Sequence, residues 1–136
     1  MRVFIDTSAW VAYFDKKDTN HESALKIWQQ LKQEKVILCT TDYILDEMLT
    51  LLKIRANSDA ALIAVNAIIQ SPSTEVIWIK EKLFMDALKL FEKYNDQRFS
   101  FTDCISFEVM KTSNIQKAFA FDLDFLKAGF ETIAKT

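Results

Sequence analysis

Glycine and proline are almost absent from this sequence, which has one of each, Gly129 and Pro72, in 136 residues. Phosphate-binding loops that depend on several glycines are therefore excluded. The scarcity of both residues also favours long regular elements joined by short polar breaks. If the protein handles phosphate groups, it holds them by something other than a glycine-rich loop.

Histidine and cysteine are scarce as well, with one His and two Cys in the chain. Cys39 and Cys104 lack a metal-type spacing, and we expect both to be buried free thiols. His21 lies in a segment, residues 19–22, that has the spacing of a helix capping box, so we expect it to be structural. A zinc site, which prefers His and Cys ligands, is disfavoured.

The sequence also lacks a positive charge excess and a long apolar run. Lys and Arg total 17 against 19 Asp and Glu, so the chain has no general positive charge that would indicate a nucleic-acid partner. The longest apolar stretch, residues 60–69, is about half the length that spans a bilayer. Residues 1–6 contain too few apolar side chains for a signal-peptide core. We therefore expect no membrane span and a cytoplasmic location.

Half of the residues are hydrophobic, enough for a core in a single domain of residues 1–136. Apolar runs of strand length predict strands at 2–6, 36–39, 76–79 and 117–121, and one near 132–134. Helical periodicity predicts helices at 7–14, 19–34, after 41, at 58–70, after 79 and at 102–112, with a single turn before Gly129. This alternation predicts an α/β fold, a three-layer α/β/α sandwich with a mainly parallel sheet of about four to five strands.

Two acids follow predicted strands directly. In α/β folds of this kind, ligands bind in the crevice outside the carboxyl ends of the strands. Asp6 comes after the first strand and Asp122 after the fourth. Either residue alone could simply cap the helix that follows. Two such acids on separate strands favour a functional site.

Glu47 lies on a predicted helix in an apolar row with Ile44, Leu51 and Ile54, where an unpaired charge is costly. An internal salt bridge would explain it, but the chain has only three arginines, so we favour a bound metal ion. Two neighbouring acids lie four residues apart on what we expect to be a solvated face, Asp42 and Asp46.

Asp103 is the fourth candidate and lies in the first turn of a predicted helix, where the helix dipole alone would stabilise it. It shares its helix row with Phe107 and Met110 rather than with charged residues, so we expect it to face packed structure.

Four carboxylates in one crevice cannot all stay ionised without a cation, because each raises the pKa of the others. Oxygen ligands without His or Cys suit Mg²⁺ or Mn²⁺, as one or two ions. Such a site orients a phosphodiester and lowers the pKa of a bound water. The candidate catalytic residues and metal ligands are therefore Asp6, Glu47, Asp103 and Asp122.

These acids lie in four segments spread over nearly the whole chain: residues 3–10 (VFIDTSAW), 43–52 (YILDEMLTLL), 100–103 (SFTD), and 119–125 (FAFDLDF) followed by Gly129 and Phe130. In this order the segments resemble the motifs of PIN-domain ribonucleases, specifically VapC-type toxins of toxin–antitoxin pairs. The resemblance assigns the motif acids to the same four residues.

The resemblance implies an endoribonuclease that depends on Mg²⁺ or Mn²⁺ and leaves 3′-hydroxyl and 5′-phosphate ends. It implies that Thr7 or Ser8 holds a ligand or a metal-bound water, although helix capping would explain them equally well. Asp124, two residues after Asp122, either assists or is merely solvated. Proteins of this kind commonly form homodimers and accept a small antitoxin protein near the active site.

RNA that approaches an acidic site needs basic residues at its rim to offset repulsion, and five residues are candidates: Lys16, Lys17, Lys53, Arg55 and Arg98. Residues 58–69 are apolar almost all round, which is typical of either central core or a subunit surface, and we expect a homodimer.

A second class of function stays open: a catalytically silent α/β binding module whose acids form a structural metal site or an acidic docking surface. A phosphatase or phosphotransfer domain fits less well, because residues 6–8 lack the second Asp of such a motif.

Overall fold

Apolar runs of the sequence form a parallel sheet at the centre of the computed structural model, which describes residues 1–133. The strand order is β3-β2-β1-β4-β5, and every neighbouring pair is parallel. The strands are β1 (Arg2–Ile5), β2 (Ile37–Thr41), β3 (Thr74–Ile77), β4 (Lys117–Phe119) and β5 (Glu131–Thr132). The parallel sheet of about four to five strands predicted from the sequence is confirmed.

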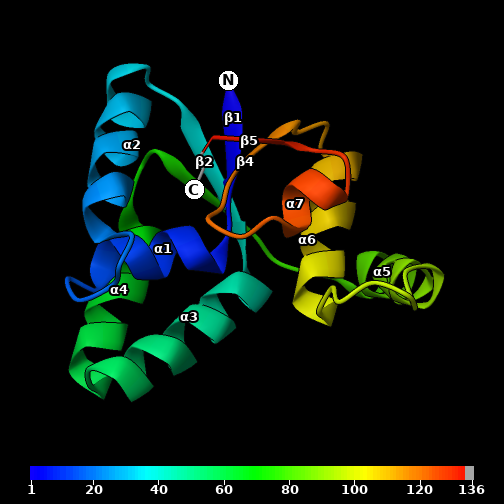
Figure 1. The fold of residues 1–136 in the computed structure, drawn as a ribbon, viewed down its shortest axis with the longest axis horizontal. Helices are drawn as coiled ribbons and strands as arrows, with labels where there is room; N and C mark the ends of the chain where they lie inside the picture. The colour runs from blue at the N-terminus through cyan, green and yellow to red at the C-terminus, as the bar shows by residue number, and fades with distance from the viewer. Residues whose placement is uncertain (134–136) are drawn as a thin grey trace.

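Helices cover both faces of this sheet (Figure 1). On one side lie α1 (Thr7–Phe14), α2 (His21–Gln33), α3 (Asp42–Arg55) and α4 (Ser58–Gln70). On the other lie α5 (Glu81–Lys93), α6 (Phe101–Thr112) and α7 (Asp124–Lys127). The arrangement is the predicted three-layer sandwich. None of the helices within residues 1–133 has the length and hydrophobicity needed to cross a membrane.

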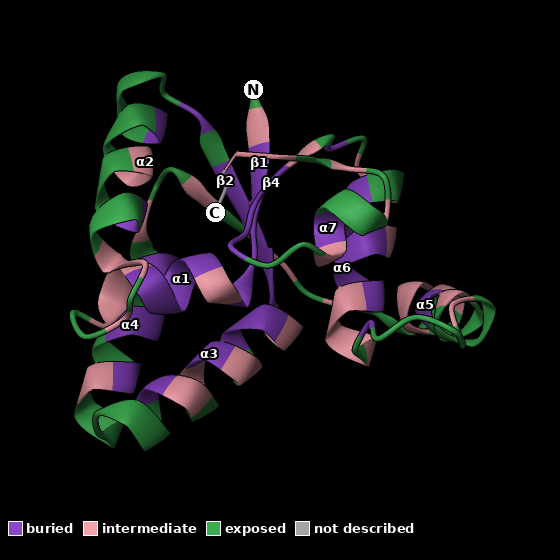
Figure 2. Ribbon diagram, in the orientation of Figure 1, coloured by how far each residue is buried: buried purple, intermediate pink, exposed green. Residues whose placement is uncertain are grey.

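The core fills the space on both sides of β1. Val3, Phe4 and Ile5 are completely buried, as a strand covered on both faces requires. Figure 2 shows burial concentrated in the strands and on the inward sides of α1, α3 and α6, whereas α5 buries only Ala87. Cys39 and Cys104 are buried free thiols, as expected, and burial raises the pKa of each to about 11.

The strand after α4 begins two residues earlier than predicted, at Thr74 instead of residue 76. Its pairing with β2 starts at Leu38 and Thr74, and beyond the strand the Ile79 amide donates to Asp42 Oδ1 at 3.0 Å. Asp42 is therefore half-buried and makes a specific contact on the helix face that was predicted to be solvated, whereas Asp46 is exposed.

Strand β4 is shorter than predicted, ending at Phe119 rather than at residue 121. The Phe121 amide donates to Ser8 Oγ at 3.0 Å instead of to a neighbouring strand. At the end of the sheet, β5 covers part of the predicted strand at 132–134, and Ala134 lies outside the described residues. Gly129, with φ of 99°, provides the left-handed turn between α7 and β5.

The capping box predicted at residues 19–22 is absent from the described structure. Asn20 is the N-cap of α2 without a side-chain hydrogen bond, and its own amide donates to Asp18 Oδ1 at 2.8 Å. His21 Nδ1 lies 2.8 Å from the carbonyl oxygen of Ala12, which agrees with a structural role and ties α2 to α1.

Candidate active site

The strand order reverses beside β1, because β2 and β3 lie on one side of it and β4 and β5 on the other. At such a switch point the loops after the two central strands diverge and leave a crevice at their carboxyl ends. A cavity of about 380 Å³ occupies this place, bounded by the starts of α1 and α6 and by one face of α3. In Figure 1 the carboxyl end of β1, where α1 begins, is the lower end of the sheet.

The structure brings all four predicted acids into the wall of this acid cavity. The three additional residues suggested by the sequence, Thr7, Ser8 and Asp124, line it as well. The remaining lining residues are Val11, Asp18, Asn20, Leu51, Arg55 and Ser100.

Asp6 occupies the innermost position, directly after β1, and is 4% exposed. Its backbone amide donates to the Phe119 carbonyl at 3.0 Å, which fixes it against β4. Burial raises the pKa of the Asp6 carboxyl well above its ordinary value, and the nearby carboxylates of Asp122 and Asp103 raise it further. Hydrogen bonds from Ser8 oppose this shift.

Ser8 connects the two central strands of the site. Its hydroxyl donates to Asp6 Oδ2 at 2.8 Å and accepts from the Phe121 amide at 3.0 Å. The Ser8 amide also donates to Asp6 Oδ2 at 3.3 Å, so Asp6 is the N-cap of α1 while it faces the cavity. Capping and site formation are therefore combined in one pair of residues.

Thr7 differs from its neighbour because it is buried and its Oγ1 has no hydrogen-bond partner within residues 1–133. A buried hydroxyl without a partner costs free energy, and such groups are uncommon in folded proteins. Since Thr7 lines the acid cavity, this buried oxygen lies in the cavity wall, next to Asp6 in the sequence.

Glu47 reaches the cavity from the middle of α3 and is half-buried. The apolar row predicted around it is only partly right: Ile44 is fully buried, but Ile54 is 75% exposed. Within residues 1–133 no basic side chain forms an ion pair with Glu47. The salt-bridge explanation considered from the sequence therefore finds no support in the described residues.

Asp103 enters from the first turn of α6. It forms a capping box with Ser100, in which Ser100 Oγ accepts from the Asp103 amide and Asp103 Oδ2 accepts from the Ser100 amide, both at 3.0 Å. Despite these bonds, burial raises the pKa of Asp103 to about 6, and the charges of Asp124 and Asp122 add to the shift. Asp103 therefore lies in the first turn of α6, as predicted, and takes part both in the helix cap and in the cavity wall.

Asp122 lies in the bend between β4 and α7, three residues beyond the strand, so its predicted position directly at a strand end is wrong. It is exposed, and its Oδ1 accepts from the Asp124 amide at 3.1 Å. Asp124 follows as the first residue of α7, where burial and the charge of Asp122 raise its pKa.

Sequence reasoning did not select Asp18 and Asn20, which line the cavity from the α1–α2 loop. No motif marks them.

Arg55 is the one predicted rim residue that lines the cavity. The other four are exposed and lie outside its lining: Lys16, Lys17, Lys53 and Arg98. Glu47, Leu51 and Arg55 recur every four residues on α3, a spacing that could have placed Arg55 beside the acids.

The carboxylates stand around the cavity wall rather than in a closed shell. Among residues 1–133, no three Asp, Glu, His or Cys side chains are arranged so that they could already hold a metal ion. The candidate metal ligands are chemically uniform, because every charged one is a carboxylate oxygen. Thr7 adds a hydroxyl that has no hydrogen-bond partner within the described residues. Hard divalent cations such as Mg²⁺ prefer ligands of this type.

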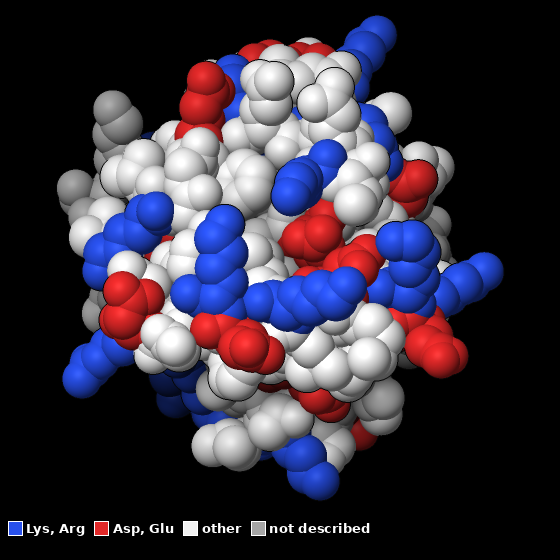
Figure 3. Space-filling model, turned by 90° about the vertical axis from the view of Figure 1, so that its right-hand side faces the viewer, with Lys and Arg blue, Asp and Glu red and all other residues white. Residues whose placement is uncertain are grey.

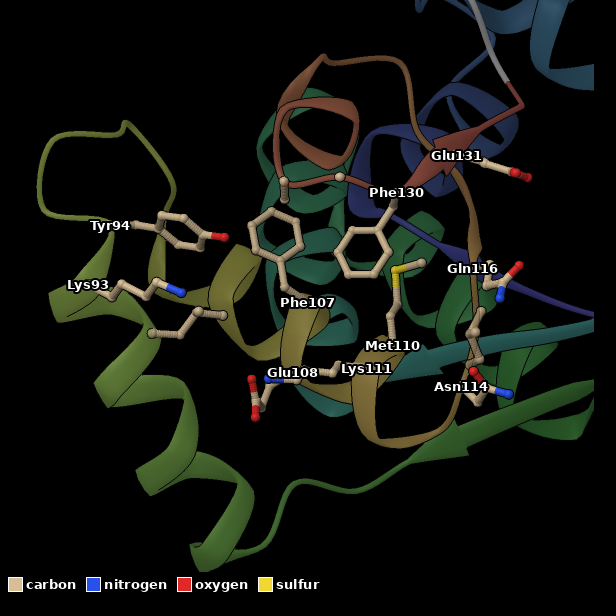
Figure 4. Close-up of a pocket in the computed structure, with 14 residues that line it drawn as sticks. Lys93, Tyr94, Phe107, Glu108, Met110, Lys111, Asn114, Gln116, Phe130 and Glu131 are labelled. Carbon is tan, nitrogen blue, oxygen red and sulfur yellow. The ribbon is translucent and has the colours of Figure 1, made fainter.

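A second pocket, of about 540 Å³, opens beside the carboxyl-terminal half of α6 (Figure 4). The rings of Phe107 and Phe130 stack there with centroids 5.7 Å apart. Its rim carries charges of both signs, from Lys93, Glu108, Lys111 and Glu131. This mixed lining differs from the acid cavity, which concentrates charge of one sign and is the stronger candidate for catalysis.

Comparison with known proteins matches residues 3–131 to the sequence model of the PIN domain. The chain is 34% identical over 128 residues to the 23S rRNA-specific endonuclease VapC20 of Mycobacterium tuberculosis, covering 94% of this chain and 95% of that protein. It is 30% identical over 128 residues to a VapC ribonuclease of Archaeoglobus fulgidus, covering 92% of this chain and 80% of the relative.

Solved structures give the same result for the fold. The crystal structure of Mycobacterium tuberculosis VapC20, described as a sarcin-ricin loop cleaving toxin, superposes with a TM-score of 0.87 over 94% of this chain and 95% of that chain. The VapBC2 complex of Rickettsia felis, crystallised with a DNA fragment from its promoter, matches with a TM-score of 0.71 at 11% identity, over 99% and 98% of the two chains.

Proposed function

Since this chain belongs to the PIN-domain family, we propose that it is an endoribonuclease, the toxin of a toxin–antitoxin pair, with residues 1–136 as a single nuclease domain. The observation that carries the proposal is the convergence of four motif acids from distant parts of the chain on one cavity at the switch point of the sheet. Its RNA substrate would place this activity in the cytoplasm.

We propose that Asp6, Glu47, Asp103 and Asp122 hold one or two Mg²⁺ or Mn²⁺ ions and are the catalytic residues. The raised pKa values of Asp6 and Asp103 support this assignment, because burial and then the charges of neighbouring carboxylates oppose ionisation of both side chains, and a bound cation would relieve that cost. The unpartnered hydroxyl of Thr7 supports it too, since an entering ligand or water would satisfy that oxygen.

The chain's own residues prepare the site in this scheme. When bound, the ion supplies a Lewis acid for the phosphodiester and lowers the pKa of a water molecule. Ser8 holds Asp6 in one orientation and ties it to the loop that carries Asp122. The capping box fixes Asp103 in the same manner, so two of the four acids are oriented before any ligand arrives.

Ribosomal RNA is the first substrate to test, because the 34% identical relative is a 23S rRNA-specific endonuclease. The experiment incubates purified protein with 23S rRNA and with a sarcin-ricin loop oligonucleotide, with Mg²⁺ or with EDTA, beside Asp6→Asn. We expect one cleavage position that needs both Mg²⁺ and Asp6. Cleavage that persists after chelation and substitution would exclude the metal-dependent site.

The second candidate is the catalytically silent binding module, in which the same cavity acids hold a structural ion but no phosphodiester is cut. It predicts that Mg²⁺ raises the melting temperature while neither RNA is cut. Expression of the protein alone separates the two functions, since a nuclease arrests growth in the wild type but not in Asp6→Asn.

We further propose that the protein forms a homodimer through α4 and binds a small antitoxin protein. Helix α4 buries one face, yet Leu62, Ile63 and Ile69 on its other side are 53%, 70% and 49% exposed. Apolar exposure of this kind marks protein interfaces. Sedimentation should give a dimer for the wild type and a monomer for Ile63→Lys; a wild-type monomer at micromolar concentration would refute the dimer.

RNA binding also depends on charge outside the cavity. Without the four proposed ligands, the chain has 15 acidic residues against 17 basic ones. Figure 3 shows long Lys and Arg side chains interspersed with Asp and Glu over the face formed by α5, α6 and α7. The body around the acids is therefore mildly basic, which supports an RNA substrate in spite of the acidic site.

A further inference from the structure

Arg55, the last residue of α3, is the one basic residue among the described residues that line the acid cavity. Its Nη1 lies 2.9 Å from Asp18 Oδ2 and 3.5 Å from Asp15 Oδ2. The Arg55 side chain is 44% exposed, whereas the two acids are only 14% and 15% exposed. The guanidinium thus lies at the mouth of the cavity, with two carboxylates beneath it.

The α1–α2 loop that supplies these carboxylates is organised by its own hydrogen bonds. Asp15 Oδ1 accepts from the Lys17 amide at 3.0 Å, and Asp18 Oδ1 accepts from the Asn20 amide at 2.8 Å. Each acid therefore uses one oxygen to hold the loop and the other to meet Arg55. If Arg55 moved away, the bonds that shape the loop would remain.

The place of Arg55 on α3 fits an extended polyanion. Glu47, Leu51 and Arg55 line the cavity at successive turns of the helix, so Arg55 lies about 12 Å along the axis from Glu47. A phosphate at Glu47 and a phosphate at Arg55 would belong to the same strand but to different nucleotides. Arginine suits the second position because its planar fork binds phosphate through two hydrogen bonds.

Building on the proposed ribonuclease function, we propose that Arg55 binds a backbone phosphate flanking the scissile one, and that it exchanges Asp18 for that phosphate when RNA enters. In the free protein the carboxylates of Asp15 and Asp18 then occupy the guanidinium of Arg55, and they compete with the RNA phosphate for it. Arg55 is a substrate-positioning residue in this scheme, and Asp18 weakens RNA binding.

The test compares Arg55→Gln with Asp18→Asn, because a phosphate exchange and a purely structural ion pair predict different signs. Both substitutions break the same pair, and Asn retains an oxygen for the Asn20 amide. We expect Arg55→Gln to raise the Kd and KM for single-stranded RNA roughly tenfold with little change in kcat. Asp18→Asn should lower both constants, and Arg55→Lys should recover part of the loss.

Lys32→Gln is the matched control, since it removes one positive charge from an exposed position in the last turn of α2, outside the cavity lining and outside the predicted rim. Its Kd should stay within about twofold of the wild type. Equal weakening by Arg55→Gln and Asp18→Asn, with equally lowered melting temperatures, would overturn the proposal in favour of a structural clamp. An Arg55→Gln variant that binds RNA as well as Lys32→Gln would overturn it too.

Measurement of Kd by fluorescence anisotropy in EDTA separates this inference from the proposed function. RNA that binds the wild type and responds to Arg55 and Asp18 without being cut on addition of Mg²⁺ refutes the nuclease and supports the exchange. Cleavage that is normal in Arg55→Gln, with unchanged KM, refutes the exchange alone. A wild type that neither binds RNA in EDTA nor cuts it on addition of Mg²⁺ refutes both.

Discussion

Carboxylates at the two ends of the central strand β1 show opposite pKa shifts. Near its amino end, Arg2 pairs with Glu75 and donates to the Ser113 carbonyl, and this pairing lowers the pKa of Glu75. At its carboxyl end, burial and neighbouring carboxylates raise the pKa values of Asp6 and Asp103. The surroundings therefore stabilise the ionised carboxylate of Glu75 and destabilise the ionised carboxylates of Asp6 and Asp103.

The two places differ in burial and in the number of basic side chains beside the carboxylates. Glu75 is half exposed and has its own arginine, so its charge is balanced by the protein. Among the described residues, Arg55 is the only basic side chain that lines the acid cavity, and it already pairs with Asp15 and Asp18. The Arg2–Glu75 ion pair therefore contributes to the fold, whereas the carboxylates of the acid cavity lack enough basic partners and are suited to bind a cation from solution.

The largest effect expected from this contrast is on RNA cleavage. Asp6→Asn removes a proposed ligand from the centre of the cavity, and we expect the rate of RNA cleavage to fall at least about 100-fold. Glu75→Gln removes a carboxylate of the balanced pair and should leave cleavage unchanged. A single-turnover assay on the two variants decides; similar losses in both would show that the two ends do not differ in function.

The next effect is on metal-linked stability. Mg²⁺ at 100 times its Kd should raise the free energy of unfolding of the wild type and Glu75→Gln by about 2.7 kcal/mol. Asp6→Asn should lose most of this gain, because a neutral amide is a poorer ligand for a hard cation. Chemical denaturation with and without Mg²⁺ measures it, and an equal gain in Asp6→Asn would speak against the site.

The third effect is the pH dependence of the metal-free protein. The pKa of Asp103 is raised from 3.8 to about 6, so the folded state binds more protons than the unfolded state across that interval. The free energy of unfolding should therefore fall as pH rises through this window. Glu75, with its lowered pKa, contributes stability that is lost as pH falls instead.

Denaturation midpoints at pH 5 and pH 7 in EDTA test this sign. The wild type should be more stable at pH 5, and Asp103→Asn, which retains a side-chain oxygen for the Ser100 amide, should reduce the difference. Saturating Mg²⁺ should reverse the trend, because it binds the ionised carboxylates. A wild type that gains stability from pH 5 to pH 7 without metal would contradict the raised pKa values.

The smallest effect concerns Thr7. Thr7→Val replaces its unpartnered hydroxyl with a methyl group of similar size, and we expect the metal-free protein to gain about 1 kcal/mol of stability. If the hydroxyl serves a ligand, Mg²⁺ affinity should fall in the same variant. Ser8→Ala is the matched comparison, since it loses two hydrogen bonds and should be destabilised.

Sequence patterns predicted the strands and helices well where burial dictates the residue type. Val3, Phe4 and Ile5 could only be a covered strand, and Asp6 directly after them marked the site. The edge strand β3 was misplaced by two residues because its side chains are half exposed and its bounds follow its pairing with β2. Local composition carries no information on that pairing.

The parts of the site that stayed hidden depend on contacts between distant segments. Asp18 has an ordinary loop sequence, and only the folded chain brings it to Arg55, 37 residues away. Asp122 was placed at a strand end, but the Phe121 amide bonds to Ser8 instead and ends β4 early. Such hydrogen bonds between a side chain and a remote backbone have no periodic signature.

The bond between Ser8 and the Phe121 amide joins residues 113 positions apart, and this separation has a consequence during synthesis. At about 5–20 residues per second, the second partner follows the first by roughly 6 to 23 s. Until then Asp6 lacks the Asp122 loop beside it, and the growing polypeptide carries only three of the four proposed ligands. A nuclease built in this order stays inert on the ribosome that makes it and acquires activity only as its last quarter emerges.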